Sequence, residues 1–194
     1  EISSCDWSSD VCSSDLEPGA IAAPTAGLHF TDEILTGLRN KGVCIAGLTL
    51  HVGWGTFKPI VSDDLNNHKM MSEKYHIDAA NAALINASVK NGKRIVSVGT
   101  TSARALESLA AETGFGEDGK IYIKEFSGET SIFIYPGYEF KIVDALVTNL
   151  HLPKSTPLMM ASAFASRELI LKAYKEAVEK RYRFFSYGDS MLII

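Results

Sequence analysis

Residues 94–111 read R-I-V-S-V-G-T-T-S-A-R-A-L-E-S-L-A-A, and this stretch decides the fold class. The apolar run 94–98 predicts a short buried strand, and the pattern that follows predicts a helix from Thr101 or Ser102 to about Ala111. Gly99 lies where the strand gives way to the helix. A strand that leads directly into a helix is typical of layered α/β proteins. We therefore expect an α/β fold.

Other segments repeat this alternation. Helices are expected at 32–41 and 78–90, from Thr156 onward and at 167–180, with Thr31, Asp78 and Ser166 as caps for three of them. Strands are expected at 43–52, where nearly every residue is apolar, and at 122–126, 131–135 and 141–150. The last three strands follow one another in hairpin style, with a turn at 136–137. This order predicts a mixed sheet or barrel core flanked by helices.

The first sixteen residues differ in character from the rest. Residues 5–16 read C-D-W-S-S-D-V-C-S-S-D-L, which resembles a translated sequencing adapter and has no apolar periodicity. It lacks the basic start and apolar core of a signal peptide. We therefore expect residues 1–16 to be a disordered, non-native segment, and residues 17–194 to be the C-terminal part of an α/β domain.

Composition limits the function classes. The chain carries 19 Lys and Arg against 23 Asp and Glu, and four of the acids lie in the first sixteen residues, so the remainder is neutral. Neutrality gives no general signal for nucleic acid, and any site for a polyanion must be local. Cys44 is the one cysteine beyond residue 16, which excludes disulfides and a cysteine zinc site there. It is expected to be a small core residue. We expect a cytoplasmic protein.

Polar clusters follow four of the expected strand-like segments. They begin near Pro24, His51, Gly99 and Thr148. Ligands of open α/β sheets bind beyond the carboxyl ends of strands, so the four clusters predict one composite site, although turns and caps alone would also place polar residues there. The G-T-T-S stretch 99–102 could receive a carboxylate or phosphate at a helix start.

The histidines do not have the spacing of a helical zinc motif. No metal site is expected. His29, His51 and His151 each end a strand-like run and are candidates for proton transfer near neutral pH. Arg104 and Glu107 lie three residues apart on the expected helix and could simply pair with each other.

Seven ordered strings resemble one family. They are A-A-P-T-A-G-L-H-F-T, L-H-V-G-x-G-T-F, H-K-M-x-S-E, V-G-T-T-S-x-R-x-L-E, I-F-I-Y-P-G-Y-x-F, T-N-x-H-L-P-K-S-T and F-x-S-Y-G-D-x-M-L-I. Together they look like the S-adenosylmethionine:tRNA ribosyltransferase-isomerases, the QueA family of queuosine biosynthesis. The resemblance runs from Glu17 to Ile194.

The resemblance implies a reaction and its substrates. S-adenosylmethionine would donate its ribosyl group to 7-aminomethyl-7-deazaguanine in tRNA, giving epoxyqueuosine and releasing adenine and methionine, with no metal. It also implies an α/β domain whose small inserted β domain belongs to the N-terminal half that is missing here. A monomer is expected. Because that half is missing, we expect the chain as written to be poorly active.

The resemblance and the polar clusters give three sets of candidate site residues. The proton-transfer candidates are His29, His51 and His151. The candidates for binding S-adenosylmethionine are Thr25, Phe30, Gly53, Gly55, Thr56, Phe57, Gly99, Thr100, Thr101 and Ser102. The candidates for binding tRNA or another substrate group are Arg104, Tyr135, Asn149, Lys154, Ser155 and Thr156.

Three other interpretations stay open. The chain could be an inactive fragment, a non-catalytic tRNA-binding module or an S-adenosylmethionine methyltransferase. The expected glycine-rich donor loop of a methyltransferase is not found in the sequence. A methyltransferase would release S-adenosylhomocysteine, whereas the family that the chain resembles releases adenine.

Overall fold

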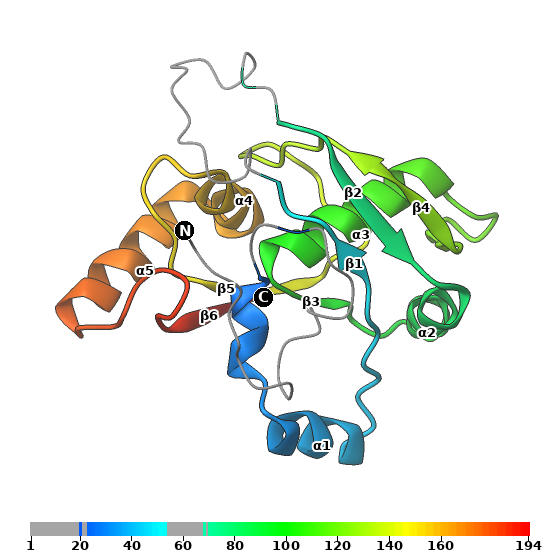
Figure 1. Ribbon diagram of the computed structural model, residues 1–194, viewed down its shortest axis with the longest axis horizontal. Helices are drawn as coiled ribbons and strands as arrows, with labels where there is room; N and C mark the ends of the chain where they lie inside the picture. Colours follow the sequence, from blue (N-terminus) through cyan, green and yellow to red (C-terminus); the bar gives the residue numbers. More distant parts are fainter. Residues whose placement is uncertain (1–19, 21–22, 54–67, 69) are drawn as a thin grey trace.

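A computed structural model describes residue 20 and residues 23–53, 68 and 70–194. Within these residues the strands form two three-stranded sheets, and helix α3 (Thr100–Thr113) contacts strands of both (Figure 1). This is the mixed α/β architecture that the sequence predicts. The described strands do not close into a barrel, so of the two expected forms the mixed sheet is the one observed.

Sheet A consists of β1 (Thr49–Leu50), β2 (Glu73–Ile77) and β4 (Phe126–Thr130), in that order. Both pairings are antiparallel. Along β2, alternate side chains are buried: Glu73, Tyr75 and Ile77 face the interior. One face of sheet A therefore packs on the core and the other is open to solvent.

Sheet B consists of β3 (Val96–Val98), β5 (Ala145–Asn149) and β6 (Ser190–Ile193), with β5 in the centre. The β3–β5 pairing is parallel, and the β5–β6 pairing is antiparallel. Because β3 and β5 are parallel, their carboxyl ends meet at one edge. Gly99 and Asn149 both lie at this edge.

Helix α3 forms the centre of the core. Eight consecutive residues from Ala103 to Ala110 are buried, and three of them are alanines that leave room for both sheets. Leu109 is fully buried and belongs to the same apolar cluster as Tyr75 of sheet A and Leu146 of sheet B. The two sheets are therefore joined through this one helix.

The remaining helices surround the sheets. They are the 3₁₀ helix η2 (Thr25–His29), α1 (Asp32–Asn40), α2 (Ala79–Lys90), α4 (Thr156–Ala165) and α5 (Arg167–Glu179). Thr31, Asp78 and Ser166 accept hydrogen bonds from backbone N–H groups at the starts of α1, α2 and α5, as predicted. Figure 1 shows α4 and α5 together on the side of sheet B.

Three strand predictions are wrong. In the segment 43–52 only Thr49–Leu50 is a strand, and Val43, Cys44 and Ile45 are exposed, so Cys44 is not a core residue. The predicted strand 122–126 shares only Phe126 with β4, and 131–135 is not a strand. The strands β4 and β5 belong to different sheets, so they do not form the expected hairpin. An apolar run becomes a buried strand only where partners cover both its faces, which the sequence does not reveal.

Candidate active site

The carboxyl end of β3 turns directly into helix α3. Gly99 sits in the turn with a φ of 89°, and its N–H donates to the carbonyl of Val147 on β5 at 2.8 Å. Gly99 is the N-cap residue, so no side chain caps the first turn of α3 within the described chain. Thr100 begins this turn, one residue earlier than predicted. The first N–H groups of α3 thus remain for an anion.

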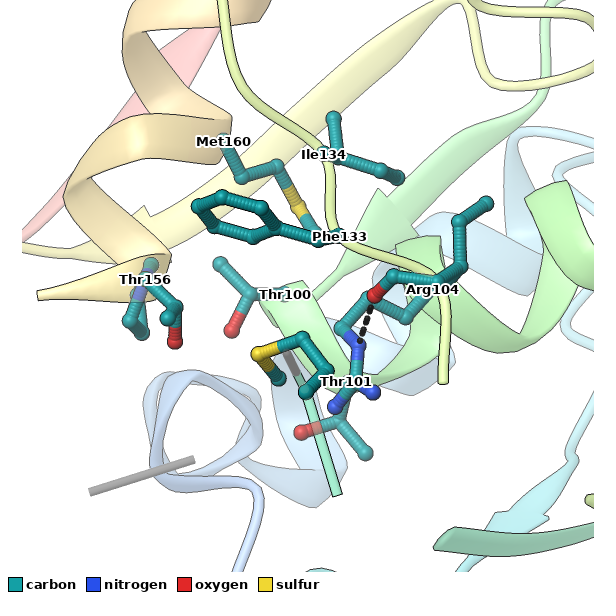
Figure 2. A pocket seen from close by; sticks show the side chains of 10 residues that line it. Thr100, Thr101, Arg104, Phe133, Ile134, Thr156 and Met160 are labelled. Carbon is teal, nitrogen blue, oxygen red and sulfur yellow. Dashed lines mark hydrogen bonds between the residues drawn. The ribbon is translucent and has the colours of Figure 1, made fainter. Parts of the chain in front are cut away.

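A pocket opens beside this helix start. Its apolar side chains come from 132–134, Met70 and α4, and its polar ones are Thr100, Thr101, Arg104 and Thr156. The empty space, including the mouth toward solvent, is about 310 Å³. Figure 2 shows Thr100, Thr101 and Arg104 of α3 facing a hollow that Phe133 and Met160 cover from above. The pocket thus combines apolar walls, hydroxyl groups and one cation, as ligand sites usually do.

A second polar group lies at the end of β5. The hydroxyl of Thr25 donates to Oδ1 of the buried Asn149 at 3.1 Å, and Nδ2 of Asn149 lies 3.5 Å from Nε2 of His29. The two partners of Asn149 come from η2, more than a hundred residues earlier. The first, third and fourth sequence clusters therefore meet around the edge of sheet B, as η2 also packs on β5.

His151 continues this group. Its Nε2 lies 2.6 Å from the hydroxyl of Thr148, and its backbone N–H donates to the hydroxyl of Tyr174 at 2.7 Å. Burial lowers the pKa of His151 to about 4. The ring is therefore neutral at pH 7, so it can exchange hydrogen bonds but is a weak proton acceptor.

Arg104 and Glu107 do not pair with each other, contrary to the simple interpretation. Arg104 forms a buried salt bridge with Glu73 of β2, and its Nε donates to the carbonyl of Ile132 at 3.3 Å. Glu107 instead accepts bonds from the hydroxyl of Tyr138 and from the backbone N–H groups of residues 141–143 at 2.9 to 3.1 Å. The two side chains therefore extend from α3 toward different parts of the fold, Arg104 toward sheet A and Glu107 toward the segment before β5.

His51 lies elsewhere. It lines a shallow hollow on the solvent face of sheet A, with Lys74, His76, Ser127 and Glu129 among its neighbours. His29 and His151 lie instead at the edge of sheet B. The three histidines are therefore not brought to one point by the described residues.

The other predicted residues fall into four groups. Thr156 is buried and lines the pocket, while Ser155 caps α4 by accepting from the N–H of Leu158 at 3.3 Å. Phe30, Gly53, Ser102 and Tyr135 are half-buried, and the Tyr135 ring centre lies 5.0 Å from that of Phe133. Lys154 is exposed, with a φ of 58°. Gly55, Thr56 and Phe57 lie outside the described residues.

Comparison with known proteins identifies the family. The family model described as "Queuosine biosynthesis protein" matches residues 13–193. The chain belongs to this queuosine biosynthesis family. It is also similar to the crystal structure of S-adenosylmethionine tRNA ribosyltransferase from Thermotoga maritima, with 43% identity and a TM-score of 0.70. That match covers 87% of this chain and 51% of the Thermotoga chain, so the chain spans about half the length of that relative.

In this member of the queuosine family, the sequence did not point to Met70, Phe133 and Met160, which line the pocket, or to Glu73, which contacts the pocket residue Arg104. Glu73 and Met70 were overlooked although both stand in the H-K-M-x-S-E string. Phe133 and Met160 were overlooked because apolar residues within apolar runs look like core residues. For Glu73 a signal existed: a carboxylate at an inward position of an alternating strand requires a partner.

The described residues contain neither a metal-binding cluster nor a membrane-spanning helix. No group of three or more His, Cys, Asp or Glu side chains there could hold a metal ion. No helix there has the length and apolar character needed to span a membrane.

Proposed function

We propose that the protein transfers and isomerises the ribosyl group of S-adenosylmethionine onto 7-aminomethyl-7-deazaguanine in tRNA, forming epoxyqueuosine. Membership of the queuosine biosynthesis family carries this proposal, together with 43% identity to a tRNA ribosyltransferase. The reaction needs removal of a proton next to the sulfonium, attack by the amine and departure of adenine. These steps require an acid or base and a site that holds the methionine part still.

The pocket beside α3 suits the methionine carboxylate. Thr100 and Thr101 supply hydroxyl groups beside the first N–H groups of helix α3, and Arg104 supplies a positive charge. In the proposal Gly99 and Ser102 complete this cradle, while Thr25, Phe30 and the segment that contains Gly53, Gly55, Thr56 and Phe57 contact the rest of the donor. A carboxylate at such a helix start gains from both hydrogen bonds and the helix dipole.

Proton transfer is assigned to His29, with His51 and His151 as the further candidates. His29 is half-buried beside Asn149, where a substrate could reach it. The low pKa of His151 favours a hydrogen-bonding role over that of a base at neutral pH. Tyr135, Asn149, Lys154, Ser155 and Thr156 are proposed to contact the tRNA or its target base. The tRNA substrate implies a cytoplasmic enzyme, which we propose acts as a monomer without a metal.

Product analysis tests the function. The full-length protein is incubated with S-adenosylmethionine and tRNA that carries 7-aminomethyl-7-deazaguanine, and the products are separated by chromatography. We expect adenine, methionine and epoxyqueuosine. Release of S-adenosylhomocysteine would indicate a methyltransferase, and tight, salt-sensitive tRNA binding without donor binding would indicate a non-catalytic module. The same assay is run on the chain of residues 1–194. If this chain forms no epoxyqueuosine, it is an inactive fragment.

Single substitutions test the assigned residues. Thr100→Ala and Thr101→Ala should each weaken donor binding by about tenfold, the effect of losing one hydrogen bond to a charged group. His29→Ala should lower turnover by about a hundredfold or more if His29 transfers the proton. Normal donor affinity in both threonine variants would contradict the proposed carboxylate cradle. Normal turnover after an alanine substitution at His29, His51 or His151 would show that this histidine does not transfer the proton.

A further inference from the structure

Glu73 is a buried carboxylate that none of the steps above uses. It is 3% exposed at the start of β2, on the face of sheet A that packs against α3. Its Oε2 pairs with the guanidinium of Arg104, and its Oε1 accepts a hydrogen bond from the backbone N–H of Gly53 at 2.9 Å. A single side chain thus joins a pocket residue to the segment that follows β1.

Stability alone does not account for this pair. Removing two charges from water is costly, and apolar pairs of the same size are often as stable or more so. The ion pair has an effect that an apolar pair would not have: it orients a guanidinium group. The guanidinium is planar and its N–H groups point in fixed directions, so contact with a carboxylate sets its orientation. The carbonyl of Ile132 holds Nε of Arg104 at 3.3 Å, so the group is fixed from two sides.

The neighbourhood keeps Glu73 itself in place. Thr130 lies directly opposite Glu73 in the β2–β4 register, and its hydroxyl lies 2.6 Å from that of Ser108 on α3. The same Thr130 hydroxyl accepts from the N–H of Ile132 at 3.1 Å. Sheet A, helix α3 and the pocket wall 132–134 are therefore joined by one set of buried hydrogen bonds. A shift of Glu73 would be passed to Arg104 and to Gly53 alike.

We propose that Glu73 is a positioning residue for the carboxylate of the donor. It aims the guanidinium of Arg104 at the carboxylate in the pocket, and its other oxygen holds the backbone N–H of Gly53. The inference rests on the proposed function, because that function supplies the donor. Glu73 would act through Arg104 and Gly53, without touching the donor itself.

A pair of donors tests this role. Binding of S-adenosylmethionine and of decarboxylated S-adenosylmethionine is measured by calorimetry on the full-length protein, in complex with tRNA that carries guanine at the target position so that no turnover occurs. The wild type should prefer the carboxylated donor by about tenfold or more. Glu73→Gln should reduce this preference to about threefold or less while binding of the decarboxylated donor stays within about threefold. Glu129→Gln, on the solvent face of β4, is the matched control and should keep the full preference.

Each other outcome contradicts part of the argument. An equal loss for both donors in Glu73→Gln means a structural role alone, and an unchanged preference means that Arg104 is directed without Glu73. If Glu73→Gln does not fold, Glu73→Asp keeps the charge but shortens the side chain by one methylene, and the same reduced preference is expected. If the wild type binds neither donor, the proposed function is wrong and this inference falls with it. If it binds them with equal affinity, the carboxylate cradle and this inference are both wrong, whereas the proposed reaction stands.

Discussion

At the scale of single residues, Glu107 is a buried side chain on which the stability of the fold depends. It is fully buried and accepts bonds from the hydroxyl of Tyr138 and from three successive backbone N–H groups that precede β5. Glu107→Ala would leave these donors without partners, so we expect the free energy of unfolding to fall by about 3 kcal/mol or more. Urea unfolding measures the loss. Glu112→Ala, an exposed position on the same helix, should stay within about 0.5 kcal/mol of wild type.

A second residue-scale prediction concerns the pH dependence of stability. Burial lowers the pKa of His151 to about 4, below the value of about 6.5 expected for the unfolded chain. The unfolded state therefore binds the proton first, so stability is full above pH 6.5 and falls as the pH drops toward 4. The expected loss is about 2 kcal/mol by pH 5. Unfolding curves at pH 7 and pH 5 measure it. The His151→Gln variant has no imidazole to titrate, so its stability should fall less between pH 7 and pH 5. If it keeps the whole pH dependence, His151 is not the group responsible.

At the scale of elements, the junction of α4 and α5 combines a useful contact with a strained backbone. Ser166 caps α5 by accepting from the N–H of Leu169 at 3.2 Å, but its φ of 119° suits glycine better than serine. Ser166→Ala loses the cap and keeps the strain, so stability should fall by about 1 kcal/mol. Ser166→Gly loses the same cap but relieves the strain, so it should be at least as stable as wild type. Thermal unfolding of both variants tests this order, and equal losses would show that no strain exists.

The elements also show which parts of the fold the sequence could predict. Helices were predicted well because Thr31, Asp78 and Ser166 are local signals that act within one turn. Strands were predicted poorly because pairing depends on distant partners: β5 pairs with β3 and β6, and not with β4, the strand that precedes it in sequence. The site followed the same rule. The helix start at Gly99 could be predicted locally, whereas the Glu73–Arg104 pair and the separate place of His51 depend on how sheet A packs.

At the scale of the whole molecule, helix α3 packs against strands of both sheets. Leu109→Ala should lower stability by about 2–5 kcal/mol, the range for removing a large buried side chain. Since Leu109 shares one apolar cluster with residues of both sheets, hydrogen exchange should speed up in β2 and β5 together. Loss of protection in one sheet alone would show that the sheets unfold separately. Leu171→Ala, 46% exposed on α5, is the control and should change neither.

The strand order of sheet B has a consequence for synthesis on the ribosome. Of the strands that the structure describes, those of sheet A have all been made once residue 130 has emerged, whereas the partner of β3 in sheet B, β5, follows nearly fifty residues later and β6 comes only at 190–193. Helix α3 is made long before the surface that covers its second side. During translation that side of α3 therefore stays open to solvent, and the edge that holds Gly99 and Asn149 takes shape only when the last strand docks.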